Sequence, residues 1–230
     1  MTVNIHDVIP MKVVEKMKCK AEYTARMKVT HTMDTWLRKR TPQERFVTLY
    51  EGDLAKVALR EFFAINSVPH EDYDEERDDN FKYRDKWDIR VKGRYLVEIK
   101  SSVESRTTDV ETVLSQRRYM VYPGKEADIN VQAYYIPRLS GFEISFANFI
   151  KNMSEVRRLD LDEIAKQLTE KLKVVYLMGW IGREELGSRQ TFVMDPTLTG
   201  ERGRKHYNVK ICEGNKMADL NGYIQSLSLT

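Results

Sequence analysis

The sequence of 230 residues contains only two cysteines, Cys19 and Cys212, which are too few for a disulfide framework or a Cys₄ metal site. It has no uninterrupted apolar run of about 18 residues, so no membrane span is expected. Residues 1–10 lack a basic stretch followed by an apolar one, which argues against a secretory signal. These absences predict a cytoplasmic protein with reduced thiols that does not enter a membrane.

Several common catalytic signatures are missing as well. Neither a Gly-rich phosphate loop nor a Gly-x-Ser-x-Gly elbow occurs, and the histidines show no metal-ligand spacing. The histidines are His6, His31, His70 and His206. The chemistry therefore has to be sought among the acidic and basic side chains.

The chain is rich in charge, with 32% charged residues beside 41% hydrophobic and 10% aromatic ones. This composition and the length predict one globular domain over residues 1–230. The formal net charge is only +3, which is weak evidence for a nucleic-acid partner. Its distribution is more informative, because residues 1–45 hold ten Lys and Arg residues against five Asp and Glu residues. We expect a basic, helical region there.

Residues 86–102 read as a tight β-hairpin. Side chains alternate between the two faces of a strand, and a slip of one residue exchanges the faces. A two-residue loop would mix polar and apolar side chains on both faces, whereas a three-residue loop at 92–94 separates them. The expected cross-strand pairs are Asp88 with Glu98, Ile89 with Val97, and Trp87 with Ile99. The polar face then carries Asp88, Arg90, Glu98 and Lys100, with Leu96 as the one apolar exception.

This polar face has the groups needed to hydrolyse a phosphodiester. Directly opposed side chains have Cβ atoms roughly 5 Å apart, so Asp88 and Glu98 would repel each other unless a cation or proton lay between them. Mg²⁺ is usually bound through one or two carboxylates plus substrate phosphate, and it lowers the pKa of a bound water. The Ile99 carbonyl would add an oxygen ligand. Lys100 would orient the attacking water or stabilise the developing charge.

An Asp on one strand and Glu-x-Lys on the next, here Asp88 and Glu98-Ile99-Lys100, resembles the restriction-endonuclease-like, or PD-(D/E)XK, nuclease superfamily. The resemblance covers a motif-bearing core at about residues 45–137, and it implies an α/β fold with a mixed central β-sheet flanked by helices on both faces. It also implies Mg²⁺, replaceable by Mn²⁺, on the two carboxylates, and a lysine that assists the water nucleophile. The usual Pro before the Asp is Trp87 here, and the lack of a cysteine quartet argues against the iron–sulfur nucleases that share the motif.

In that superfamily a first helix often donates one more acid, and here that helix is predicted at residues 44–65. A Thr-Pro-x-Glu sequence at residues 41–44 is a helix start. Glu51 is the first candidate for the extra acid and Glu61 the second. Gly52 interrupts the helix, which close packing or a bend near the site would explain. A solvent-facing helix acid is the alternative interpretation of Glu51.

Residues expected to contact nucleic acid either follow the motif strand or belong to a basic cluster. They are Ser101, Ser102, Gln116, Arg117, Arg118, Arg202, Arg204 and Lys205. For any single one of them, a solvated surface position is the alternative. The acidic run at residues 71–79 is expected to form an exposed connection or an edge that DNA avoids.

The pattern of apolar residues and turn signals predicts the remaining elements. Expected helices are 8–28, 108–119, 141–152, 159–172 and 216–227, with a turn or short helix at 182–186. Expected strands are 67–73, 129–136, 174–181 and 206–212. The order of helix, hairpin, helix and strand fits an α/β domain.

These inferences favour a Mg²⁺-dependent DNA endonuclease that hydrolyses phosphodiester bonds in double-stranded DNA. The simplest form is a type II-like restriction endonuclease, a homodimer whose two-fold symmetry places one site on each strand. The first alternative is a phage, transposon or repair nuclease of the same fold that acts on branched or free-ended DNA. The second is a non-catalytic DNA-binding or interaction module, since an acid-x-Lys pattern on a solvated hairpin would look the same.

Overall fold

The computed structural model describes residues 2–31, 40–104, 107, 109–136, 153–193 and 205–228. Its main-sheet strands are β1 (Ile9–Lys12), β2 (His70–Asp72), β3 (Ile89–Val91), β4 (Tyr95–Val103), β5 (Ile129–Tyr135) and β6 (Val174–Gly182). Its α-helices are α1 (Glu15–Val29), α2 (Pro42–Ile65), α3 (Tyr73–Glu76), α4 (Val110–Gln116), α6 (Met153–Val156), α7 (Leu161–Lys171), α8 (Arg183–Gly187) and α10 (Leu220–Ser226). Shorter elements are η1 (Ile5–Asp7), β7 (Thr191–Val193), β8 (Lys205–Tyr207), η2 (Ile211–Glu213) and η3 (Met217–Asp219).

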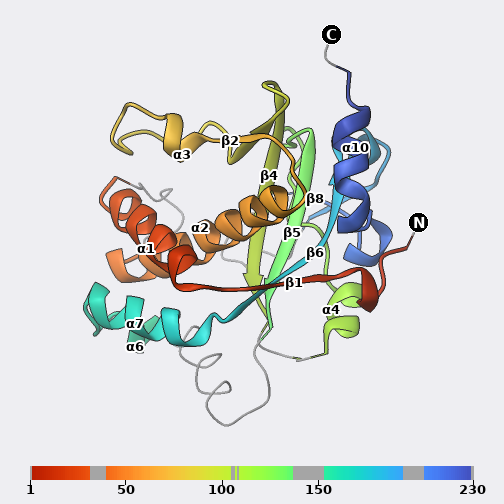
Figure 1. The fold of residues 1–230 in the computed structure, drawn as a ribbon. Coiled ribbons are helices and arrows are strands. Elements are labelled where there is room, and N and C mark those ends of the chain that lie inside the picture. Colours follow the sequence, from red (N-terminus) through yellow and green to blue (C-terminus); the bar gives the residue numbers. More distant parts are fainter. Residues whose placement is uncertain are drawn as a thin grey trace.

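The main sheet runs in the order β1-β6-β5-β4-β3-β2 (Figure 1). The β4–β5 pair is parallel, and the remaining neighbours are antiparallel. Helix α4 lies in the connection between β4 and β5, as parallel neighbours require a crossover. The sheet is therefore mixed, and the predicted α/β class is confirmed. Strands β7 and β8 pair with each other in a separate small sheet.

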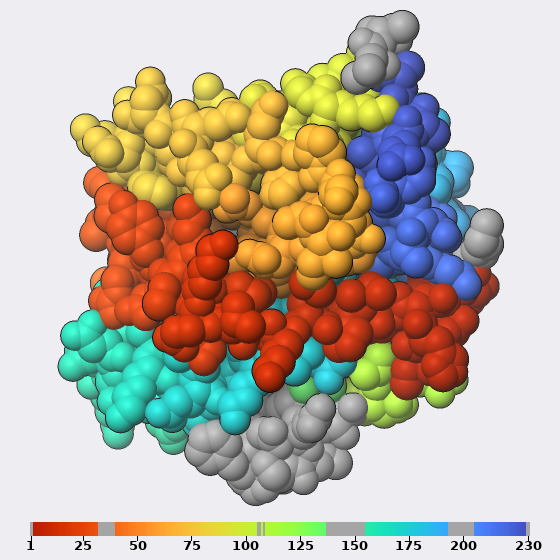
Figure 2. All heavy atoms as spheres, viewed as in Figure 1, coloured from red at the N-terminus to blue at the C-terminus, as the bar shows by residue number. Residues whose placement is uncertain are grey.

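Apolar side chains from the two faces of the sheet enter two cores. The larger core lies between the sheet and helices α1, α2 and α7, and it includes Phe46, Phe63 and Ile164. Figure 2 shows this side of the molecule, with α1 in red beside α2 in orange. The smaller core lies on the other face, where α4 and α8 contribute Val113 and Leu186. Below, these two sides of the sheet are called the α2 face and the α4 face.

Several predicted element boundaries are confirmed. Helix α2 begins with a capping box, in which Thr41 N donates to Glu44 Oε2 over 2.6 Å and Glu44 N donates to Thr41 Oγ1 over 3.2 Å. Asp109 caps α4 by accepting hydrogen bonds from the backbone of Glu111 and Thr112. The strand expected at residues 129–136 is β5, whose seven residues are all buried.

Other sequence-based expectations are wrong in part. Residues 9–12, expected within a helix, form β1 and pair with β6, which suits Pro10 because proline breaks a helix interior. The helix expected at 108–119 ends at Gln116, and the chain then extends alongside residues 207–211. The strand expected at 206–212 is shorter and gives way to η2. The helix expected at 141–152 lies outside the described residues.

The acidic run at residues 71–79 was expected to be an exposed connection or an edge. Strand β2 does lie at the edge of the sheet, yet Asp72 is only 2% exposed and the Asp74 side chain is equally buried. Both carboxylates pair with cations from α2, which compensates for the loss of hydration.

Within the described ranges, no helix combines the length and the apolar character needed to cross a membrane.

Candidate metal-dependent hydrolytic site

The β3–β4 hairpin has the register predicted from the sequence. Ile89 pairs with Val97 and Val91 with Tyr95, which leaves the three-residue loop at 92–94. Gly93 has a positive φ of +69°, a conformation that glycine adopts without steric cost. Lys92 also has a positive φ, of +49°. Its ammonium donates to the carbonyls of residues 225 and 227 near the C-terminus, over 2.8 and 2.6 Å.

Asp88 lies directly before β3, in a bend where the regular pairing of β3 with β4 has ended, so the predicted pairs of Asp88 with Glu98 and of Trp87 with Ile99 are not part of the ladder. Its Oδ2 accepts a hydrogen bond from the backbone N–H of Ile99, with 3.0 Å between the atoms. The N–H and C=O groups of one strand residue point to the same side, so the Ile99 carbonyl also faces the β3 edge of β4. The Lys100 ammonium contacts Glu98 Oε1. The hairpin thus brings together the three motif side chains and one backbone carbonyl.

The motif side chains are neither fully buried nor fully solvated. The Glu98 side chain is 31% exposed and that of Lys100 is 40% exposed, so a phosphate group can reach both. Burial raises the pKa of Asp88, the Lys100 charge opposes that rise, and the nearby Glu98 carboxylate adds to it. Burial lowers the pKa of Lys100, but Glu98 and Asp88 outweigh it, and the net shift is upward. Lys100 therefore carries a proton at neutral pH.

The donor set fits a hard divalent cation of the Mg²⁺ type. Two carboxylates and one carbonyl are oxygen ligands, and Mg²⁺ commonly takes one or two carboxylates and completes its shell with water and substrate phosphate. A cation between Asp88 and Glu98 would also relieve the repulsion that contributes to the raised pKa of Asp88. In the part of the chain that the structure describes, no group of three or more His, Cys, Asp or Glu side chains is arranged to hold a metal ion.

The predicted extra acid, Glu51, approaches β4 from the α2 face. Its backbone carbonyl accepts hydrogen bonds from Tyr135 OH over 2.7 Å and from Ser101 Oγ over 3.3 Å. Ser101 and Lys100 are consecutive strand residues, so their side chains point to opposite faces. Burial raises the pKa of the Glu51 carboxyl to about 8, and its Oε1 atom is buried without a hydrogen-bond partner. Among the described residues, this carboxyl makes no ion pair with the motif side chains.

The second candidate for the extra acid is paired with a lysine of α1. Glu61 lies near the C-terminal end of α2, and its carboxylate is 3.9 Å from the ammonium of Lys16 on α1. That contact places Glu61 on the side of α2 that faces α1. Of the two acids, Glu51 is the one whose backbone is hydrogen-bonded to the motif strand.

A group of buried ion pairs beside Asp88 was not anticipated from the sequence. It joins α1, α2 and the chain before β3, and we call it the buried ion network. Its members are Lys28, Asp53, Lys56, Asp72, Asp74, Arg77 and Asp85. The available signal was the spacing of Asp53 and Lys56, charged residues three apart that alternate with buried apolar positions of α2.

The network anchors the segment that leads into Asp88. Asp85 lies 2.7 Å from the Lys28 ammonium and 2.6 Å from the Arg77 guanidinium. The positive charge of Lys56 also lowers the pKa of Asp88 and so opposes the effect of burial. Burial raises the pKa of Asp53 to about 7, although Lys28 and Lys56 lower it. Lys28 alone thus joins three segments close to the motif, because it pairs with Asp53 on α2, Asp74 on α3 and Asp85 before β3.

The residues expected to contact DNA fall into different surroundings. Ser101 faces α2. Ser102 lies two residues after Lys100 in the same strand, so the two side chains point to the same face. Arg117 pairs with Glu104 over 2.5 Å, while Arg118 donates to Asn208 over 2.7 Å and is exposed. Gln116 and Lys205 are also exposed. Arg202 and Arg204 lie outside the described residues.

Much of the positive charge predicted for the N-terminal region is locally neutralised. On α1, Lys18 pairs with Glu15, Arg26 pairs with Glu22 and Asp162, and Lys28 belongs to the buried ion network. The surplus of basic residues in the sequence therefore does not translate into an equal surplus of free cations on this helix.

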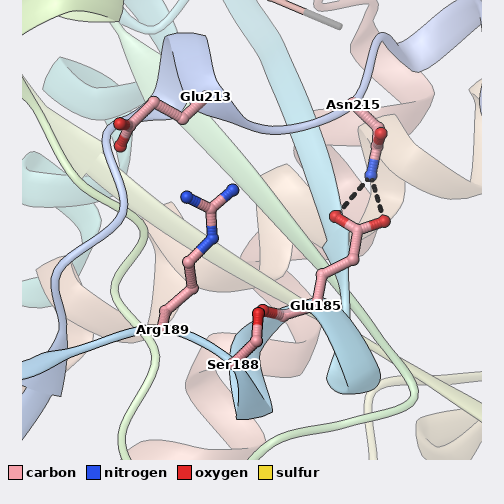
Figure 3. A pocket seen from close by; sticks show the side chains of 5 residues that line it. All are labelled: Glu185, Ser188, Arg189, Glu213 and Asn215. Atoms are coloured by element: carbon pink, nitrogen blue, oxygen red, sulfur yellow. Dashed lines mark hydrogen bonds between the residues drawn. The ribbon is translucent and has the colours of Figure 1, made fainter.

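A separate polar pocket of about 420 Å³ opens near α8 and η2. Its lining residues are Glu185, Ser188, Arg189, Glu213 and Asn215. Figure 3 shows the Arg189 guanidinium between the two acidic side chains, and the Asn215 amide donates to both Glu185 carboxylate oxygens over 2.9 Å. None of these five residues belongs to the hairpin motif.

Comparisons with known proteins identify no relative, because no family model, no curated protein and no solved structure matches the chain.

Proposed function

We propose that the protein is a metal-dependent DNA endonuclease that hydrolyses phosphodiester bonds at the Asp88, Glu98 and Lys100 cluster. The observation that carries the proposal is the hydrogen bond from Ile99 N to Asp88, which holds an Asp beside a Glu-x-Lys whose ammonium contacts the Glu carboxylate. The element order supports it. Helix α2, the antiparallel β2-β3-β4 meander, α4 and a β5 strand parallel to β4 form part of a mixed sheet with helices on both faces, which is the arrangement that the resemblance to the PD-(D/E)XK superfamily implies.

Each motif group has a chemical role in this proposal. Asp88, Glu98 and the Ile99 carbonyl would hold Mg²⁺ or Mn²⁺ together with a phosphate oxygen of the substrate. The bound ion would lower the pKa of a water molecule and stabilise charge on the phosphoryl oxygens. Lys100, protonated by the influence of both carboxylates, would hydrogen-bond to the attacking oxygen or to the developing oxyanion. As the water oxygen bonds to phosphorus, the bond to the 3′ oxygen breaks, leaving a 5′-phosphate and a 3′-hydroxyl.

The form of DNA that is cut separates two versions of the proposal. A restriction-type enzyme would act on duplex DNA as a homodimer, one cluster on each strand. A phage, transposon or repair nuclease would act on branched or free-ended DNA. Discrete bands from plasmid DNA support the first version, and cuts confined to junctions, flaps or ends support the second.

The direct test is cleavage of mixed plasmid and oligonucleotide DNA in Mg²⁺ by the wild type, Asp88→Asn and Lys100→Met. The wild type is expected to cut, and Lys100→Met to lose about a hundredfold to a thousandfold in rate while still binding DNA. Lys92→Met is the matched control, because Lys92 lies in the same hairpin but its ammonium is hydrogen-bonded to the C-terminal segment. No metal-dependent cleavage by the wild type on any of these substrates would reject the nuclease in favour of a non-catalytic module.

A further inference from the structure

Four side chains on the α4 face form a continuous line, which we call the aromatic strip. It consists of Tyr122, His206, Phe192 and Arg118. The ring centroids of Tyr122 and His206 are 4.4 Å apart, and those of His206 and Phe192 are 5.7 Å apart. The Arg118 guanidinium lies 5.3 Å from the Phe192 ring centroid. The strip thus joins the chain after α4 to both strands of the small sheet.

One end of the strip is linked to the Lys100 backbone through Gln132. Gln132 is the direct neighbour of Lys100 across the β4–β5 pair, and its amide donates to the Lys100 carbonyl over 3.1 Å. The Gln132 Oε1 atom accepts a hydrogen bond from Met120 N, also over 3.1 Å, which fixes the segment that leads to Tyr122. Strip and motif therefore share one face of the sheet.

Exposure to solvent differs along the strip. His206 is only 4% exposed and fills the space between its two aromatic neighbours. Phe192 and Tyr122 are half-buried, and Arg118 is exposed. The buried histidine keeps the two outer rings in place, while the arginine adds a cation at the far end. Rigid aromatic rings next to a cation are the features that bind successive bases of a single strand.

We propose that the aromatic strip binds unpaired nucleotides of the DNA strand that enters the motif cluster, with a base stacked on Phe192 or Tyr122 and a phosphate near Arg118. Bases inside a duplex are already stacked on each other, so an aromatic platform adds most to the binding of unpaired ones. This inference rests on the proposed nuclease function for its substrate. It favours the version that acts on branched or free-ended DNA.

The test measures binding without cleavage, by fluorescence anisotropy in EDTA, with a labelled single strand and with the matching duplex. Phe192→Leu keeps an apolar side chain but removes the ring, and we expect it to weaken single-strand binding about fivefold to tenfold while duplex binding changes less than about twofold. Phe192→Tyr restores the ring and is expected to restore affinity. Tyr23→Leu is the matched control, since Tyr23 is 57% exposed on α1 and lies away from the α4 face. Thermal melting of each variant verifies that it is folded.

The outcomes separate this inference from the nuclease proposal. Strip-dependent binding of single strands by a protein that cuts no DNA would support the inference and reject the nuclease. Metal-dependent cleavage together with unchanged single-strand binding by Phe192→Leu would overturn the inference and leave the nuclease in place. The inference is equally overturned when the wild type prefers the duplex, or when Phe192→Leu weakens both substrates to the same extent.

Discussion

The carboxylate of Asp88 accepts a hydrogen bond from the backbone N–H of Ile99, the residue between Glu98 and Lys100, with 3.0 Å between the two atoms. This bond joins the chain before β3 to the motif strand at the point where regular pairing in the hairpin stops. It fixes one carboxylate beside the Glu-x-Lys sequence, and the candidate metal site depends on that placement.

Substitutions at Asp88 should separate catalysis from the structural role of this hydrogen bond. Asp88→Asn retains an acceptor oxygen, whereas Asp88→Ala does not, so the Ala variant should be less stable than the Asn variant by about 1 kcal/mol. Both should lose cleavage by about a thousandfold or more, because both lack the charge that binds the cation. Urea unfolding and a plasmid assay on the same preparations provide the two measurements. Equal activity of Asp88→Asn and wild type would remove Asp88 from the site.

The buried ion network should be sensitive to the loss of one cation. The Lys56 ammonium is 2.9 Å from Asp72 Oδ1 and also contacts Asp74, and its side chain is 5% exposed. Lys56→Met leaves buried carboxylates undercompensated, and we expect it to lower the free energy of unfolding by about 3 kcal/mol. Lys20→Met is the control, because the Lys20–Glu75 pair is on the surface and should contribute less than about 1 kcal/mol. Similar losses in the two variants would mean that the network is more hydrated than its burial indicates.

Glu51 should make the stability of the metal-free protein depend on pH. Its pKa is raised by burial from an ordinary 4.5 to about 8, so the folded state holds the proton more tightly than the unfolded state does. The stabilisation is complete below about pH 4.5 and is lost as the pH rises through about 8. Glu51→Gln cannot ionise and should be more stable than wild type at pH 8 to 9 by about 1 kcal/mol or more, with the difference disappearing toward pH 4.5. Denaturant unfolding at several pH values checks the sign, and a variant less stable than wild type at pH 9 would contradict it.

Two Gly→Ala changes should have opposite effects on stability. Gly93 has a φ of +69° in the hairpin loop, so Gly93→Ala should destabilise by about 1 kcal/mol through backbone strain, even though nothing lies within 4 Å of the added Cβ. Gly52 lies inside α2 with equally open space around it, so Gly52→Ala should stabilise by roughly 1 kcal/mol. Thermal unfolding of the two variants measures both. A stabilising Gly93→Ala would show that the loop has another conformation.

The sequence was sufficient for features that depend on local patterns. The alternation of apolar and polar residues around Asp88 and Glu98 distinguished a three-residue loop from a two-residue loop, because only one register separates the faces. The Thr41 and Glu44 pair predicted the start of α2 in the same way, through reciprocal hydrogen bonds within one turn.

Features that depend on distant partners could not be predicted in this way. Residues 9–12 form a strand because they pair with β6, and no local sequence pattern predicts a partner so distant in the chain. The same holds for Lys28, which looks like a surface lysine of α1 but lies among acids from three other segments. The position of Glu51 relative to the motif could not be predicted either, because it depends on which face of β4 the helix packs against.

The central claim is that Asp88 and Glu98 together hold a divalent cation beside Lys100. Anomalous scattering from crystals soaked in millimolar Mn²⁺ with a DNA oligonucleotide tests it most directly. The account predicts a metal peak within about 2.3 Å of an oxygen of each carboxylate, and loss of that peak in Asp88→Asn. A wild-type crystal with no peak between these two side chains, or with the metal held elsewhere, would contradict it.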